Sequence, residues 1–195
     1  MVRRRSYDEG EVLSGAMQAF RRKGYGALSI PELEAATGLS SGSLYNSFGD
    51  KQGIFLAAFD HYLKAVLESR IARFARPERA LEGLRQLFLS LLAEPDGGSS
   101  GCLITNAAIE FGTDSAAASG VVRKGFDILE RLFVDRLVEA KVSGAVREDV
   151  DPAVGATRLL ALYQGILVLV RGGYDKRSIR RAINLEFDVL RGETA

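Results

Sequence analysis

One stretch constrains the fold more than any other part of the sequence: residues 29–51, SIPELEAATGLSSGSLYNSFGDK. Ser29 followed by Glu32 forms a capping box, in which two side chains satisfy free N–H groups at the start of a helix. Gly38 can adopt the left-handed conformation that ends a helix. We therefore expect two short helices folded over a glycine turn, with a third helix about to start.

The second short helix is expected to have an uncharged polar outer face. Ser40 or Ser41 can cap this helix, and Leu44 and Phe48 point inward at helical spacing. A helix that enters the major groove of DNA needs a close-fitting polar face, whereas an ordinary surface helix is dominated by Lys, Glu and Arg. The pattern therefore fits a DNA-recognition helix. The alternative is a plain helical hairpin whose serines only cap and solvate it.

The same residues resemble the helix-turn-helix of TetR-family transcriptional repressors. The family pattern is a hydrophobic residue, a run of small residues, Leu-Tyr, then Phe and Lys. The chain differs from many relatives beside the lysine, where Asp50 and Gln52 stand, and Gly53 weakens the first turn of the next helix. The positions that meet the pattern are Leu39, residues 40–43, Leu44, Tyr45, Phe48 and Lys51.

This resemblance implies a fold, a domain division and a set of DNA contacts. The fold is all-α, with a three-helix DNA-binding domain in residues 1–50 and a helical bundle for ligand binding and dimerisation in residues 51–195. Arg4 and Arg5 belong to a basic tail that could lie along the DNA backbone or in the minor groove, and the alternative is a solvated terminus. Tyr45 and Lys51 are expected on phosphates, with a hydroxyl contact from Ser29. The remaining implied contacts are Ser40, Ser41, Gly42, Ser43 and Asn46.

Apolar side chains recur at helical spacing through the rest of the chain, and no strand pattern is present. A capping box at Ser6 and Glu9 predicts the start of the first helix. A long helix over residues 50–74 would carry Lys51 at one end and pocket residues at the other. We therefore expect this helix alone to transmit a movement from the ligand pocket to the DNA-binding end.

Residues 159–170 are apolar nearly all round, and we expect a second subunit to cover part of this segment. The same subunit interface is expected to include Ile183, Phe187 and Leu190.

A helical bundle that holds a ligand needs aromatic walls and a few converging polar groups. TetR-like proteins generally keep such a pocket, here expected to take a small apolar or aromatic inducer. Cys102 opens a helix after a Gly/Ser loop, where the helix dipole stabilises a thiolate, and its surroundings are similar to a branch of the family that includes electrophile-responsive repressors. The alternative for each candidate is an ordinary core residue. The candidates are Phe59, Tyr62, Phe88, Cys102, Asn106, Glu110, Phe126, Tyr163 and Gln164.

The composition excludes several classes of protein. A formal net charge of +1 over 195 residues means that DNA binding must come from a local patch. One Cys and one His provide neither a disulfide framework nor a structural zinc site, and we expect no metal and no cofactor. We expect no enzyme, because the P-loop, G-x-G-x-x-G and G-x-S-x-G motifs are absent from the sequence. Without a secretion signal or an apolar run of about 18 residues, we expect a cytoplasmic protein with no membrane partner.

We therefore interpret the chain as a ligand-responsive transcriptional repressor. It would bind a palindromic operator as a homodimer and leave the DNA when a small-molecule inducer binds. The alternative is a helical small-molecule-binding protein that has kept the scaffold and lost DNA binding. The sequence leaves open the inducer, the operator, the choice between repression and activation, and whether Cys102 is a sensor.

Overall fold

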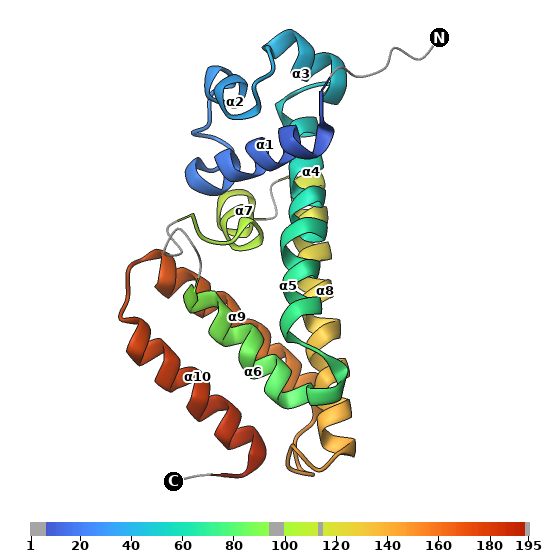
Figure 1. Cartoon of the computed structure of the whole chain (residues 1–195), viewed down its shortest axis with the longest axis vertical. Helices are drawn as coiled ribbons and strands as arrows, with labels where there is room; N and C mark the ends of the chain where they lie inside the picture. The colour runs from blue at the N-terminus through green and yellow to red at the C-terminus, as the bar shows by residue number, and fades with distance from the viewer. Residues whose placement is uncertain (1–6, 94–99, 113–114, 194–195) are drawn as a thin grey trace. The chain divides into compact units, whose positions relative to one another are not determined.

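The chain folds into helices throughout its described part. A computed structural model describes residues 7–93, 100–112 and 115–193, and no strand occurs among them. The predicted all-α class is thus confirmed. The helices group into two compact units (Figure 1). Unit 1 comprises Met1–Leu67 and Cys102–Val122, and unit 2 comprises Glu68–Gly101 and Arg123–Ala195.

Unit 1 takes in more of the chain than the DNA-binding domain predicted for residues 1–50. It also includes residues 51–67 and the later segment that begins at Cys102. The division after residue 50 follows sequence motifs rather than contacts, and it stays a prediction.

Helix α1, Glu9–Lys23, packs against α2, Ile30–Thr37, and α4, Lys51–Tyr62. Asp8 caps its start, because the Asp8 carboxylate accepts the N–H groups of Gly10 and Glu11 at 2.7 and 3.1 Å. The predicted cap Ser6 lies outside the described residues, and Asp8 fills the capping role in its place. The side of α1 that faces the other helices buries Val12, Ala16 and Phe20.

Helices α2 and α3, Ser41–Phe48, are joined by the predicted glycine turn. The carboxylate of Glu32 accepts the backbone N–H and the hydroxyl of Ser29, both at 2.9 Å. Gly38 ends α2 in the left-handed conformation, with φ 69°. The capping box and the turn are therefore both formed.

Of the two serines that could cap α3, Ser40 does so. Its hydroxyl accepts the N–H of Ser43 at 3.4 Å. Leu44 is fully buried and Phe48 is half-buried, so α3 has the predicted apolar inner side.

Gly53 allows the end of α3 to approach the start of α4. Asp50 caps α4 by accepting the N–H of Gly53 at 2.7 Å. A Cβ at Gly53 would lie 1.9 Å from the carbonyl oxygen of Phe48, far inside van der Waals contact. The sequence indicated only a weakened first turn, whereas the packing of α3 on α4 leaves no room for any side chain here.

The predicted long helix over residues 50–74 is interrupted. A π-helical segment, Leu63–Glu68, separates α4 from α5, Ser69–Phe74. Segments of this kind are rare in globular proteins and shift the register of the side chains that follow. The border between the two units, after Leu67, falls inside the π-helical segment.

Unit 2 is built around a cluster of four buried aromatic rings. The ring centroid of Phe88 lies 5.3 Å from that of Tyr163, 5.4 Å from that of Phe187 and 5.7 Å from that of Phe133. Two 3-10 segments, Pro77–Arg79 and Leu91–Ala93, flank the first helix of this cluster. The four rings come from α6, Ala80–Ser90; α8, Ala116–Val142; α9, Pro152–Arg171; and α10, Lys176–Arg191.

A charged network joins α6 to α10 in unit 2. Two nitrogens of Arg85 donate to the two carboxylate oxygens of Glu82 at 2.9 Å each, and Arg191 lies 3.2 Å from the same carboxylate. Arg85 also donates to the side-chain oxygen of Asn184 at 2.9 Å. The hydrogen bonds from Arg85 lower the pKa of Glu82 from its ordinary value of 4.5 to about 2.

Helix α9 overturns the prediction that no segment reaches the length of a membrane span. An 18-residue window of Pro152–Arg171 has a mean hydropathy of 1.7, so its length and composition would allow it to cross a membrane. One such helix is weak grounds for a membrane protein, because core helices of soluble proteins pass the same test. The inner side of α9 includes Leu159, Tyr163 and Ile166, which are buried in unit 2.

The residues predicted to meet a second subunit on α10 are instead part of the core. Ile183, Phe187 and Leu190 are at most 3% exposed, because this side of α10 packs on α6. The prediction that they lie at an interface is therefore wrong. The outward sides of α9 and α10 carry a different apolar set, 42 to 67% exposed: Val154, Val168, Leu169 and Leu185.

Candidate functional site

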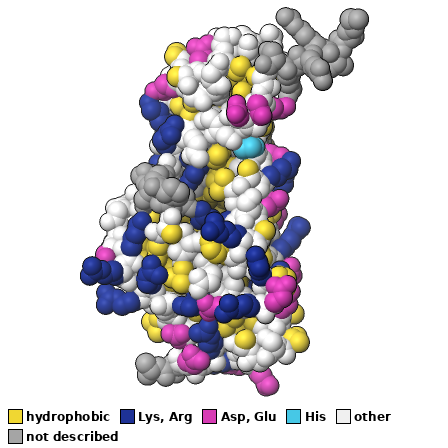
Figure 2. All heavy atoms as spheres, viewed as in Figure 1, with side chains coloured by type: hydrophobic (Ala, Val, Ile, Leu, Met, Phe, Trp, Pro, Cys, Tyr) yellow, Lys and Arg dark blue, Asp and Glu magenta, His cyan; other side chains and the backbone are white. Residues whose placement is uncertain are grey.

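Helix α3 presents an uncharged polar surface. Its sequence, SGSLYNSF, contains no ionisable side chain other than Tyr45. Gly42, Tyr45 and Asn46 are exposed, and Ser41 and the other two serines of the helix are half-exposed. Figure 2 shows the surface around α3 largely in white, the colour of backbone and uncharged polar groups. The predicted contacts in α3 thus lie on one helix and reach solvent.

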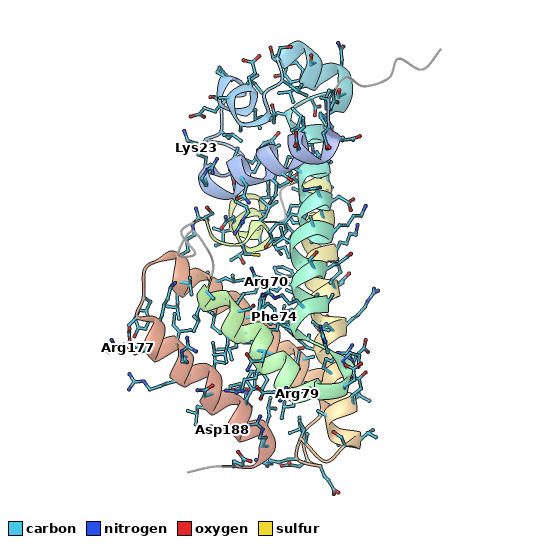
Figure 3. All side chains as sticks on the ribbon, in the orientation of Figure 1. Lys23, Arg70, Phe74, Arg79, Arg177 and Asp188 are labelled. Carbon is cyan, nitrogen blue, oxygen red and sulfur yellow. The ribbon has the colours of Figure 1, made fainter. Side chains whose placement is uncertain are left out.

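The loops before α2 and α3 add two exposed hydroxyls. Ser29 donates its hydroxyl to Glu32, and Ser40 donates its hydroxyl to that of Ser43 at 3.1 Å. Lys23, labelled in Figure 3 at the end of α1, forms an ion pair with Glu32. The hydrogen bonds from Lys23 and then Ser29 lower the pKa of Glu32 to about 2. The charge of the Glu32 carboxylate is thus paired with that of Lys23.

Lys51 is the first residue of α4 and is half-exposed. Its Nζ lies 4.7 Å from the centroid of the Tyr25 ring, a cation–π distance. Burial raises the pKa of Tyr25, and the negative charges of Asp50 and Glu110 raise it further. Sequence reasoning missed Tyr25, because nothing in its neighbourhood in the chain indicates contact with the lysine.

Arg4 and Arg5, the other predicted DNA contacts, lie outside the described residues. The contacts that are described gather on α3 and on the first residues or caps of α2 and α4. A helix N-terminus carries free N–H groups and a partial positive charge, which suits phosphate contacts.

Five of the nine predicted ligand residues lie in unit 1. Phe59 and Tyr62 are buried, and the Tyr62 hydroxyl donates to the sulfur of Cys102 at 3.2 Å. Cys102 is 4% exposed and directly precedes α7, Leu103–Phe111. The guanidinium of Arg21 lies 5.8 Å from the centroid of the Tyr62 ring. These contacts connect Cys102 through Tyr62 to α1.

Asn106 and Glu110 point their polar groups at α1 and the turn after it. The side-chain nitrogen of Asn106 donates to the carbonyl of Arg21 at 3.0 Å. The carboxylate of Glu110 accepts the N–H groups of Tyr25 and Gly26 at 2.7 and 2.5 Å. Both side chains thus have structural roles in the described conformation, and their ligand role stays a prediction.

The other four predicted ligand residues lie in unit 2. Phe88 and Tyr163 belong to the buried aromatic cluster, while Phe126 and Gln164 are half-buried. None of the nine lines the hollow of about 340 Å³ between α5 and α8. The sequence-based prediction looked for aromatic side chains and therefore missed this hollow, which has none in its lining. The hollow is lined by Glu68, Ile71, Ala72, Ile128, Arg131, Leu132 and Asp135.

Within the described ranges, no group of three or more His, Cys, Asp or Glu could hold a metal ion.

Two family models match the chain. Residues 12–58 match the model described as "Bacterial regulatory proteins, tetR family", and residues 77–185 match "Tetracyclin repressor-like, C-terminal domain". The first match spans α1 to α3 and the start of α4, which are the helices that carry the described DNA-binding candidates.

Individual proteins agree with the family models. The HTH-type transcriptional regulator YezE of Bacillus subtilis (strain 168) is 29% identical over 194 residues, covering 97% of this chain and 100% of its own length. The HTH-type transcriptional repressor ComR of Escherichia coli (strain K12) is 25% identical, covering 86% of this chain and 81% of its own. The chain is also similar to a solved structure of the TetR family regulator CifR, a cysteine variant complexed with 26 bp double-strand operator DNA. The TM-score is 0.84 at 25% identity, and the match covers 96% of this chain and 99% of the CifR chain.

Proposed function

The chain belongs to the TetR family of bacterial transcriptional regulators, and from that premise we propose that it is a repressor that binds a palindromic operator as a homodimer and is released by a small-molecule inducer. Regulation of transcription is not a catalytic function, and the proposal assigns no reaction. It places the protein in the cytoplasm, where it would reach the chromosome.

The uncharged, exposed face of α3 is the observation that carries the proposal. Gly42 leaves room for close approach, and Tyr45 and Asn46 can donate and accept hydrogen bonds at base edges or phosphates. Lys51 and the arginine tail would add positive charge for contacts with phosphates. The CifR structure, a complex with operator DNA, supports this use of the fold.

The homodimer is proposed to form through the outward sides of α9 and α10. Val154, Val168, Leu169 and Leu185 are exposed apolar side chains on these two helices. Two copies of such a helix pair would bury them in a four-helix interface. A dimer would present two α3 helices to successive major grooves, about 34 Å apart on a palindromic site.

The inducer is proposed to be apolar or aromatic and to bind beside Phe59, Tyr62 and Cys102. Tyr62 is buried and its hydroxyl donates to the sulfur of Cys102, and a small-molecule site typically combines apolar walls with a few polar groups of this kind. A ligand wedged against the Tyr62 ring would push on the end of α4, the helix that begins with Lys51. Tyr62→Ala should therefore leave operator binding nearly intact and reduce the response to the inducer.

The test is a titration of the protein against DNA from the region upstream of its own gene, with and without a panel of small apolar compounds. Specific binding at physiological salt, lost on addition of one compound, is the expected result. Binding of a compound without binding of any upstream DNA would favour the alternative of a ligand carrier that has lost DNA binding. A scrambled duplex of equal length controls for non-specific binding.

A further inference from the structure

Glu110 connects α7 to the turn that follows α1, and the whole contact lies within unit 1. Its Oε2 accepts the N–H of Tyr25 at 2.7 Å and its Oε1 accepts the N–H of Gly26 at 2.5 Å. Successive backbone N–H groups that point at one anion form an anion-binding nest. Both carboxylate oxygens are thus used to hold two neighbouring peptide groups.

Glycine residues on both sides of Tyr25 make room for this carboxylate. A Cβ at Gly24 would lie 2.9 Å from the Oε2 of Glu110, and a Cβ at Gly26 would lie 3.1 Å from its Oε1. Gly24 also has φ 82°, a conformation that other residues rarely adopt. The segment Gly24-Tyr25-Gly26 is therefore shaped to accept the side chain of Glu110.

The ring of Tyr25 extends this contact to Lys51. The Lys51 ammonium lies 4.7 Å from the ring centroid, and the ring also packs against Phe55 and Phe111 at 5.4 and 5.1 Å. Glu110 holds the backbone of Tyr25, and the ring of the same residue supports Lys51. Movement of α7 would therefore change the support beneath a proposed phosphate contact.

A second contact ties α7 to the same region. Asn106, one turn before Glu110, donates to the carbonyl of Arg21 in the last turn of α1 at 3.0 Å. Helix α7 lies in the segment that matches the C-terminal family model, residues 77–185, yet it packs in unit 1 with the DNA-binding helices. The sequence-based expectation that the long helix alone connects ligand binding to DNA binding is therefore incomplete.

We propose that Glu110 is a positioning residue for DNA binding: through Tyr25 it holds Lys51 and the start of α4 in the geometry that meets a phosphate. Displacement of α7 by an inducer would withdraw the carboxylate, free the turn after α1 and weaken operator binding. The inference rests on the proposed function and names the contact through which the inducer acts.

The first experiment compares operator affinity of Glu110→Ala, Glu110→Gln and the control Glu148→Ala. Glu148 is an exposed carboxylate of unit 2, so this control removes the same charge at a distant position in the sequence. Glu110→Ala should weaken operator binding about tenfold, on the scale of one lost charged hydrogen bond, with helical content unchanged. Glu110→Gln should fall in between, because its amide NH₂ faces one of the two N–H groups. Equal affinity of all three variants and the wild type would overturn the proposal.

A double-mutant cycle with Lys51→Ala tests the route through Tyr25. If Glu110 acts through Lys51, adding Glu110→Ala to Lys51→Ala should cost little further affinity. Fully additive losses would show that Glu110 acts elsewhere and would refute the positioning role.

Amide NMR provides a readout that does not involve DNA. The N–H resonances of Tyr25 and Gly26 should shift in Glu110→Ala and stay in place in Glu148→Ala, and unshifted resonances in Glu110→Ala would refute the contact itself. If the wild-type protein binds no upstream DNA, the proposed function is overturned, and the positioning role is overturned with it. The amide shifts would then still show whether Glu110 contacts Tyr25 and Gly26.

Discussion

Leu185→Asp should separate the proposed dimer without unfolding the subunit. Leu185 is 60% exposed on the outward side of α10, so an unpaired subunit tolerates a charge there. Burial of a whole leucine contributes about 1.5 to 3 kcal/mol, so covering this exposed part contributes about 1 to 2 kcal/mol per subunit. A two-fold interface contains the residue twice, which raises the loss to about 2 to 4 kcal/mol before the cost of burying the aspartate.

This loss corresponds to an increase of roughly thirtyfold to several hundredfold in the dimer dissociation constant. Sedimentation equilibrium over a concentration series measures the dissociation constant directly, and thermal unfolding by circular dichroism tests whether the subunit remains folded. The matched control is Val142→Asp, because Val142 is 86% exposed at the end of α8, outside α9 and α10. A Leu185→Asp protein that sediments like the wild type, or a Val142→Asp protein that dissociates equally, would refute the assignment of the interface.

Three further predictions concern the helix junctions and the charges. Gly53→Ala should lower the melting temperature and weaken operator binding, since its Cβ would meet the Phe48 carbonyl at 1.9 Å; unchanged melting would mean that the α3–α4 junction relaxes freely. Lys51→Ala should weaken specific and non-specific DNA binding together and reduce the slope of log affinity against log salt by about one, whereas an unchanged slope would remove Lys51 from the phosphates. The lowered pKa of Glu82 stabilises the fold at pH values above 4.5, the ordinary pKa of a glutamate, and this contribution is lost as the pH falls towards about 2. Acid unfolding of Glu82→Gln should therefore depend less on pH between these two values than acid unfolding of the wild type. Identical pH dependence in the two proteins would show that the bond from Arg85 does not stabilise the fold.

The sequence alone determined the features that depend on residues close together in the chain. The capping box of Ser29 and Glu32 and the left-handed Gly38 are both present as predicted. Each of these involves partners within one or two helical turns, so the sequence contains the whole interaction. The cap at Asp151, which accepts the N–H groups of Ala153 and Val154, is another contact of this local kind.

The structure alone decided which side of each helix is covered. Helix α10 has an apolar stripe at helical spacing, and a stripe of this kind is equally suited to a core and to a subunit interface. Only its packing on α6 showed that Phe187 is core and that Leu185 faces outward. The contact of Glu110 with Tyr25 joins residues 85 positions apart, and no local pattern relates two such residues. Long-range contacts of this kind depend on how complete helices pack, and that packing is set by the fold as a whole.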